Sequence, residues 1–185
     1  MPSQPQPPLQ QPTGLAARLR HETRDDHAAV DAAYGRFDLG QRDGYAAFLT
    51  AHASVLPALE ALLEPGELVP HWRGRAEALA QDLVDLGLPA PVAQSVELPD
   101  GTAARWGAIY VLEGSRLGGV VLSRRVPEGL PSRFLDSAHP AGAWRDLLVG
   151  LDRAGERSPD AAAEAVEAAR QVFREYVRAA SLVAA

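Results

Sequence analysis

The chain has 185 residues, no cysteine and a formal net charge of −6. The lack of cysteine excludes disulfides, iron–sulfur clusters and thiol catalysis, and the acidic balance argues against a nucleic-acid-binding domain. All 18 basic residues are arginines, so there is no lysine to form a Schiff base or a P-loop. No apolar run reaches the roughly 18 residues needed to span a bilayer. We therefore expect a cytoplasmic protein that contacts no membrane.

The first residues, MPSQPQPPLQQPT, have neither the basic start nor the apolar stretch of a secretory signal. Their proline and glutamine content predicts a disordered tail over residues 1–13. Helical spacing begins at residue 14 and continues almost to the end of the chain. We therefore expect residues 14–185 to form one helical domain with a sizeable core.

Hydrophobic periodicity predicts about six helices, near residues 14–33, 42–63, 71–86, 102–122, 140–153 and 158–182. Ser158 is the expected N-cap of the last helix, followed by Pro159 at its first position. Segments rich in glycine and proline separate the helices, the longest being a loop before residue 102. No segment alternates like a strand. The predicted fold class is all-α, a compact multi-helix bundle.

The first predicted helix carries a stripe at steps of four residues: Leu15, Leu19, Thr23, His27 and Asp31. A lone histidine on such a stripe is usually a core residue. Here Asp31 lies one turn after His27, where a carboxylate fixes the tautomer and orients Nε2, as it does beside metal-bound imidazoles. Arg20, two turns before His27, can pair with an anionic ligand. Haem, which is flat and carries both a metal and carboxylates, fits all three residues.

The fourth predicted helix contains YVLEGSRLGG at residues 110–119. Gly114, Gly118 and Gly119 each cost a helix interior about 1 kcal/mol relative to alanine. Such a cluster has two interpretations. It permits close helix packing or a kink, or it lets the backbone approach a flat ligand. The spacing alone leaves both open.

The stretch LRHETRDDH at residues 19–27 resembles the proximal helix of the haem oxygenases, and YVLEGSRLGG resembles their kinked distal helix. The similarity is greatest to the bacterial branch often encoded beside bacteriophytochromes. The resemblance implies a haem oxygenase-like bundle with haem b as both substrate and cofactor. It implies oxidative cleavage of haem to biliverdin, carbon monoxide and ferrous iron, with dioxygen and external electrons.

The resemblance also implies roles on the proximal side of the haem. His27 matches the iron ligand, and Asp31 matches the acid bonded to that ligand. Arg20 matches a basic residue near a haem propionate, and Tyr110 lies near a tyrosine that bonds a propionate. Phe173, on the last predicted helix, is placed either over the haem pocket or in the plain core.

On the distal side, Gly114, Gly118 and Gly119 match the glycines that let the helix lie against the porphyrin. The animal enzymes have an aspartate after the first of these glycines, where it anchors a water network. Ser115 stands there in this chain, and serine carries no charge. We therefore expect proton delivery through other waters or through Arg116.

Ser115 also leaves open a second reading, a non-catalytic haem-binding or haem-sensing protein on the same scaffold. As an enzyme, the chain needs a separate reductase or ferredoxin, because it has no flavin or nicotinamide fingerprint. A bacteriophytochrome is the implied acceptor of biliverdin. Among the other histidines, His52 is expected in the core or at the surface, and His71 and His139 in exposed loops.

Overall fold

The computed structural model describes residues 14–70, 72–157 and 159–183. Within these ranges the regular secondary structure is helical and contains no strand, which confirms the predicted all-α class. The α-helices are α1 (Leu15–Glu22), α2 (Arg24–Tyr34), α3 (Arg42–Ala53), α4 (Leu56–Leu63), α5 (Ala76–Asp85), α6 (Thr102–Leu122), α7 (Ala143–Gly155) and α8 (Pro159–Val183). Two short 3-10 turns are η1 (Pro65–Glu67) and η2 (Ser123–Arg125). The predicted tail at residues 1–13 and the predicted cap Ser158 lie outside the described residues.

The helix predicted over residues 14–33 is divided at Thr23 into α1 and α2. The buried Thr23 hydroxyl donates a hydrogen bond of 2.8 Å to the Leu19 carbonyl, a side-chain bond that competes with the regular helix ladder. The buried stripe ends at this break. Leu19 is fully buried, whereas His27 and Asp31 are exposed.

The helix predicted over residues 42–63 is also two helices, α3 and α4, with Ser54 and Val55 between them. Pro57 lies in the first turn of α4, where its missing N–H costs no hydrogen bond. Next along the chain, α5 begins only at Ala76, because the Glu60 carboxylate accepts the N–H groups of Arg75 and Ala76 at 2.7 and 3.1 Å. The predicted helix at 102–122 agrees with α6.

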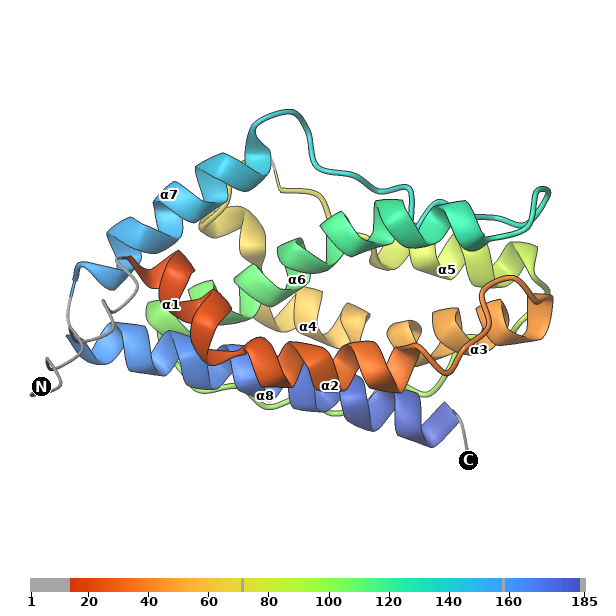
Figure 1. The fold of residues 1–185 in the computed structure, drawn as a ribbon, viewed down its shortest axis with the longest axis horizontal. Helices are drawn as coiled ribbons and strands as arrows, with labels where there is room; N and C mark the ends of the chain where they lie inside the picture. Colours follow the sequence, from red (N-terminus) through yellow and green to blue (C-terminus); the bar gives the residue numbers. More distant parts are fainter. Residues whose placement is uncertain (1–13, 71, 158, 184–185) are drawn as a thin grey trace, which may run out of the picture.

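The long helix α8 runs along one side of the molecule, with α1, α2 and α6 arranged against or above it (Figure 1). Small residues allow α6 and α8 to pack closely. A Cβ atom at Gly107 of α6 would lie only 1.9 Å from the Ala165 carbonyl oxygen of α8. In Figure 1 the axis of α6 changes direction along its length, although its helical hydrogen bonding is continuous.

One helical stretch in the described part of the chain, Arg42–Leu63, is long and apolar enough by composition to cross a membrane. It is α3 and α4 together, and 56% of its most apolar window is buried inside the protein. Its apolar residues include Leu49, Leu56 and Leu59, which are completely buried. The hydropathy of this stretch is therefore explained by its place in the core.

Gly107→Ala tests the close packing of α6 on α8. The added methyl group would meet the Ala165 backbone, which cannot rotate away, so α6 and α8 must separate. Overpacking of this kind costs about 1–3 kcal/mol of unfolding free energy, measured by urea denaturation. Gly66→Ala is the control, because a Cβ atom there meets nothing within 4 Å. Equal stability of the two variants would contradict this account of the interface.

Candidate functional site

His27 projects from α2 with 64% of its side chain exposed. Its Nδ1 lies 3.0 Å from Oδ2 of Asp31, one helical turn later. This contact favours the tautomer with the proton on Nδ1 and leaves the lone pair on Nε2. The buried ring of Phe173 on α8 meets the imidazole edge-on, with 5.8 Å between ring centroids. The imidazole is thus oriented by a carboxylate and an aromatic ring from two helices.

Arg20 in the last turn of α1 and Tyr110 on α6 lie within electrostatic reach of each other. Burial raises the pKa of Tyr110, and the positive charge of Arg20 partly opposes this. Arg20 is exposed and Tyr110 is half-buried against Trp144, with 5.9 Å between the ring centroids. The two residues predicted to bind carboxylates, 90 positions apart in the sequence, are therefore near enough for the charge of Arg20 to act on Tyr110.

One face of α6 presents bare backbone beside exposed apolar side chains. A Cβ atom at Gly118 would meet nothing within 4 Å, and one at Gly114 would meet only Trp144, at 3.6 Å. On the same face Leu117 and Val121 are 49% and 61% exposed. The packing of this chain does not require glycine at these two positions. A surface of this kind suits the approach of a flat apolar ligand.

Gly119 serves a different purpose from Gly114 and Gly118. It is buried, and a Cβ atom there would lie 3.1 Å from the Leu135 carbonyl oxygen. The glycine at this position is explained by the packing of α6 on the segment that follows it. The packing interpretation therefore applies to Gly119, and the ligand interpretation stays a prediction for Gly114 and Gly118.

Ser115 is hydrogen-bonded to a buried arginine, Arg75, which no sequence motif indicates. The Ser115 hydroxyl accepts a hydrogen bond of 2.7 Å from Arg75 Nη2 and donates one of 2.7 Å to the Leu112 carbonyl. The Arg75 guanidinium also donates to Leu112 and stacks over the Phe134 ring, 5.1 Å from its centroid. Burial lowers the pKa of Arg75, yet arginine stays protonated at neutral pH. The charge beside Ser115 is therefore positive.

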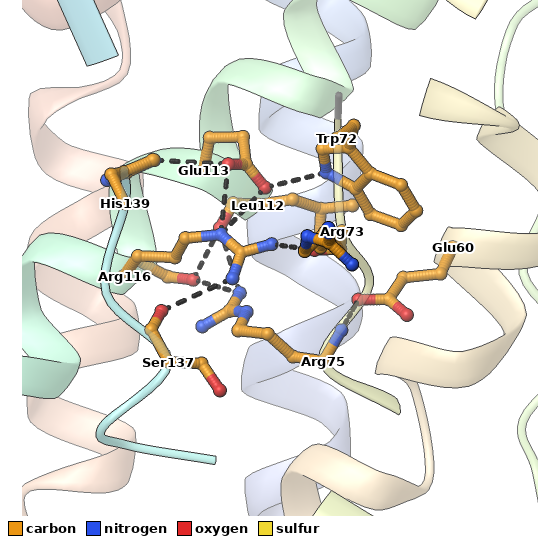
Figure 2. Close-up of polar contacts among 10 residues, drawn as sticks. Glu60, Trp72, Arg73, Arg75, Leu112, Glu113, Arg116, Ser137 and His139 are labelled. Carbon is orange, nitrogen blue, oxygen red and sulfur yellow. Dashed lines mark hydrogen bonds and ion pairs between the residues drawn. The ribbon is translucent and has the colours of Figure 1, made fainter. Parts of the chain in front are cut away.

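Arg116, the other expected route for protons, points away from the open face. Residues two apart on a helix lie about 200° apart, so Arg116 is nearly opposite Gly118. Its side chain and that of Glu113 are each only 6% exposed, and Nε lies 2.9 Å from Glu113 Oε2. The guanidinium also donates to the backbone carbonyls of Ser137 and Arg73 (Figure 2).

The expectation that His139 is exposed is wrong, because the loop that carries it folds over α6. Only 10% of its side chain is exposed, and Nε2 lies 3.1 Å from Glu113 Oε2. Neither ring nitrogen of His139 has a hydrogen-bond partner among the described residues. Burial lowers the pKa of His139, and Glu113 partly opposes this. His71 lies outside the described residues.

His52 belongs to an aromatic cluster in the core. Its ring centroid lies 4.5 Å from that of Tyr34 and 4.3 Å from that of Phe48, and its Nδ1 donates to the Phe48 carbonyl at 3.0 Å. Burial lowers the pKa of His52 to about 3. It is a neutral residue with a structural role, in agreement with one of the two expected locations.

The donor set suits a metal that arrives inside a macrocycle. In the part of the chain that the structure describes, no group of three or more His, Cys, Asp or Glu side chains could hold a bare metal ion. A single exposed imidazole with an orienting carboxylate fits a metal whose other ligands are supplied by a porphyrin. The bare face of α6 and the cation of Arg20 fit the ring and its carboxylates.

The sequence and the fold of the chain were each found to be similar to a known protein, although no sequence-family profile matches the chain. A heme oxygenase of Xanthomonas campestris pv. campestris (strain 8004) is 33% identical over 147 residues, which cover 72% of this chain and 87% of that protein. The crystal structure of the NO- and CO-bound heme oxygenase from Neisseria meningitidis matches with a TM-score of 0.77 and 27% identity, over 92% of each chain. With its all-α fold and this degree of identity, the chain belongs to the haem oxygenase family.

Proposed function

We propose that the protein is a haem oxygenase that cleaves haem to biliverdin, carbon monoxide and ferrous iron, using dioxygen and external electrons. The observation that carries the proposal is the exposed, carboxylate-oriented His27 in a chain whose α6 presents bare glycines at Gly114 and Gly118. When bound, haem b supplies the iron at which dioxygen is activated, and it is also the substrate.

His27 is the proposed iron ligand, through Nε2. Asp31 holds the proton of the imidazole on Nδ1, which keeps Nε2 available as a neutral ligand. Phe173 restricts rotation of the ring by its edge-on contact. A neutral imidazole, unlike a thiolate, does not push electron density toward early O–O cleavage.

Arg20 and Tyr110 are proposed to bind haem propionates. A guanidinium and a phenol hydroxyl are both donors to a carboxylate. Because one residue comes from α1 and the other from α6, binding would join the two helices on either side of the ligand. The exposed apolar residues Leu117 and Val121 would be covered by the ring and would help to exclude water.

Ser115 and Arg75 are proposed to order the water that delivers protons. The Ser115 hydrogen is committed to the Leu112 carbonyl, but its oxygen retains a lone pair that can accept from a water. The buried Arg75 Nε–H has no hydrogen-bond partner among the described residues and remains available as a donor. A serine and a guanidinium would thus replace the carboxylate that anchors water in the animal enzymes.

We further propose that the chain belongs to the bacteriophytochrome-associated branch, with a bacteriophytochrome as the acceptor of biliverdin. This rests on the motif around Gly114. A ferredoxin or reductase would supply the electrons. The exposed Arg124 and Arg125 of η2, which directly follows α6, offer positive charge to an acidic donor.

The alternative is a haem-binding protein that does not cleave its ligand, and the lack of an acidic group at Ser115 favours it. Reaction of the haem complex with ascorbate in air, with catalase present, separates the two functions. Loss of the Soret band with growth of a biliverdin band in the red supports the oxygenase. A stable oxy-haem spectrum would reject the oxygenase and support the binding protein.

His27→Ala tests iron ligation. Removal of the ligand should lower haem turnover by more than about a hundredfold and change the ferric haem spectrum. The exposed side chain contributes little to packing, so circular dichroism should show the same helix content. His21→Ala is the matched control, because His21 is also exposed on the neighbouring helix α1. A wild-type spectrum and full activity for His27→Ala would assign the iron to another residue.

Gly118→Leu tests the open face of α6. Leucine is the better helix former by about 0.7–1 kcal/mol, and the position is open, so the protein without haem should be as stable as wild type or more stable. Turnover should fall, because the side chain would occupy the space of the ring or of dioxygen. Gly119→Leu is the contrasting variant, since it should destabilise the protein without haem through contact with Leu135. Unimpaired turnover by Gly118→Leu would show that Gly118 faces away from the haem.

Ser115→Ala tests the proposed water anchor. A hydrogen bond to a water is worth about 1 kcal/mol, which corresponds to about a fivefold slower reaction. The measurement is biliverdin formed per haem consumed, with a reductase and catalase present. Ser123→Ala is the matched control, because the Ser123 hydroxyl also donates to a carbonyl three residues earlier, at the end of α6. A loss of about a hundredfold, on the scale of a principal catalytic donor, would contradict the shared role of Ser115 and Arg75.

A further inference from the structure

The turn of α6 that carries Gly114 and Gly118 needs support from outside the helix. Glycines weaken a helix interior because they gain the most conformational freedom when it unfolds. The open face gives little support, because a Cβ atom at Gly118 meets nothing within 4 Å and one at Gly114 meets only Trp144, at 3.6 Å. The turn must therefore be held from the opposite side.

Arg116 lies on that opposite side, and Glu113 lies at the edge of the open face, so that the two residues flank the turn. Their side chains form an ion pair in which Arg116 Nε reaches both carboxylate oxygens, at 3.0 and 2.9 Å. Each side chain is only 6% exposed. A buried charge is costly unless it is paired and its remaining hydrogen-bonding groups are satisfied.

Those remaining groups attach the pair to two segments that belong to no helix. Trp72 Nε1 donates to Glu113 Oε1 at 2.9 Å, and Arg116 donates to the Arg73 carbonyl, so residues 72–73 are held on one side. Arg116 also donates to the Ser137 carbonyl at 3.2 Å on the other side. Figure 2 shows the pair at the centre of these contacts.

The same attachment determines where Arg75 lies. Arg75 follows the held residues by only two positions, and its backbone N–H is bonded to the Glu60 carboxylate at 2.7 Å. From there its side chain reaches the Leu112 carbonyl and the Ser115 hydroxyl, at 2.9 and 2.7 Å. Residues 72–75 are thus hydrogen-bonded to α6 through Trp72, Arg73 and Arg75.

We propose that Glu113 and Arg116 are positioning residues that set the rotation and height of the glycine turn over the haem and align Arg75 with Ser115. The inference rests on the proposed function, because it concerns how the haem face is held. Hydrogen bonds are directional and specify one rotation of the helix, whereas an apolar contact of the same area would permit several. Neither residue touches the ligand in this proposal.

The test removes both charges together, because loss of one partner leaves the other buried and unpaired. In Glu113→Gln/Arg116→Met the glutamine can still accept from Trp72, but the attachments to Arg73 and Ser137 are gone. Arg105→Met is the matched control. Arg105 lies near the start of α6, pairs with Glu67 at 2.9 Å and donates to the carbonyls of Leu63 and Glu64.

Two measurements report the position of the turn. Amide hydrogen exchange of the protein without haem should be about tenfold or more faster over residues 113–119 in the double variant, and unchanged over α8. In the ferrous complex with carbon monoxide, the C–O stretching band should shift or broaden, because the polar groups near the bound ligand are no longer fixed. The control should retain the wild-type band and the wild-type exchange over 113–119.

Wild-type exchange over residues 113–119 in the folded double variant would overturn the inference, and so would a wild-type C–O band. Equal changes in Arg105→Met would also overturn it, since they would show a general loss of stability. If the wild-type protein binds no haem, the proposed function fails. Exchange in the protein without haem still shows whether the pair holds the turn.

Discussion

The structure depends on one constraint, which is that α6 leaves its backbone bare at Gly114 and Gly118 while the helix remains in place. Gly118 has open space beside it, and Leu117 and Val121 are exposed on the same face. The helix is therefore held from its other sides. Near its start, Gly107 permits direct contact with the backbone of α8. Farther along, the buried pair of Glu113 and Arg116 holds it. The weakness that glycine introduces is offset by contacts that leave Gly118 uncovered.

The same arrangement determines the charge beside Ser115. The residue after the first glycine is uncharged, and the nearest fixed charge is the guanidinium of Arg75, bonded to the Ser115 hydroxyl. A cation orients a water through the water oxygen, whereas a carboxylate accepts a hydrogen bond from the water. Beside His27, the Asp31 carboxylate lies 3.0 Å from Nδ1, a contact that leaves the lone pair on Nε2. The fixed charge beside Ser115 is thus positive, and the one beside His27 is negative.

Much of this protein was determined by the sequence alone. Hydrophobic periodicity depends on local helical geometry, so it identified the all-α class and the bounds of α6. The spacing of His27 and Asp31 on one helix is also local, and their contact at 3.0 Å follows from it. The two motifs around His27 and Gly118 led to the family that the comparisons support. The roles assigned to these residues toward haem stay predictions.

Only the tertiary structure decided which residues contact the two sequence motifs from other parts of the chain. Arg75 carries no periodic signal, and it reaches Ser115 only because Glu60 and the buried ion pair hold its segment against α6. His139, expected in an exposed loop, is buried because that loop folds over Glu113. Gly119 was grouped with Gly118 by sequence, but the backbone of Leu135 accounts for it. Each of these outcomes depends on contacts between residues far apart in the chain. Such contacts are set by how whole helices pack, and no local pattern encodes them.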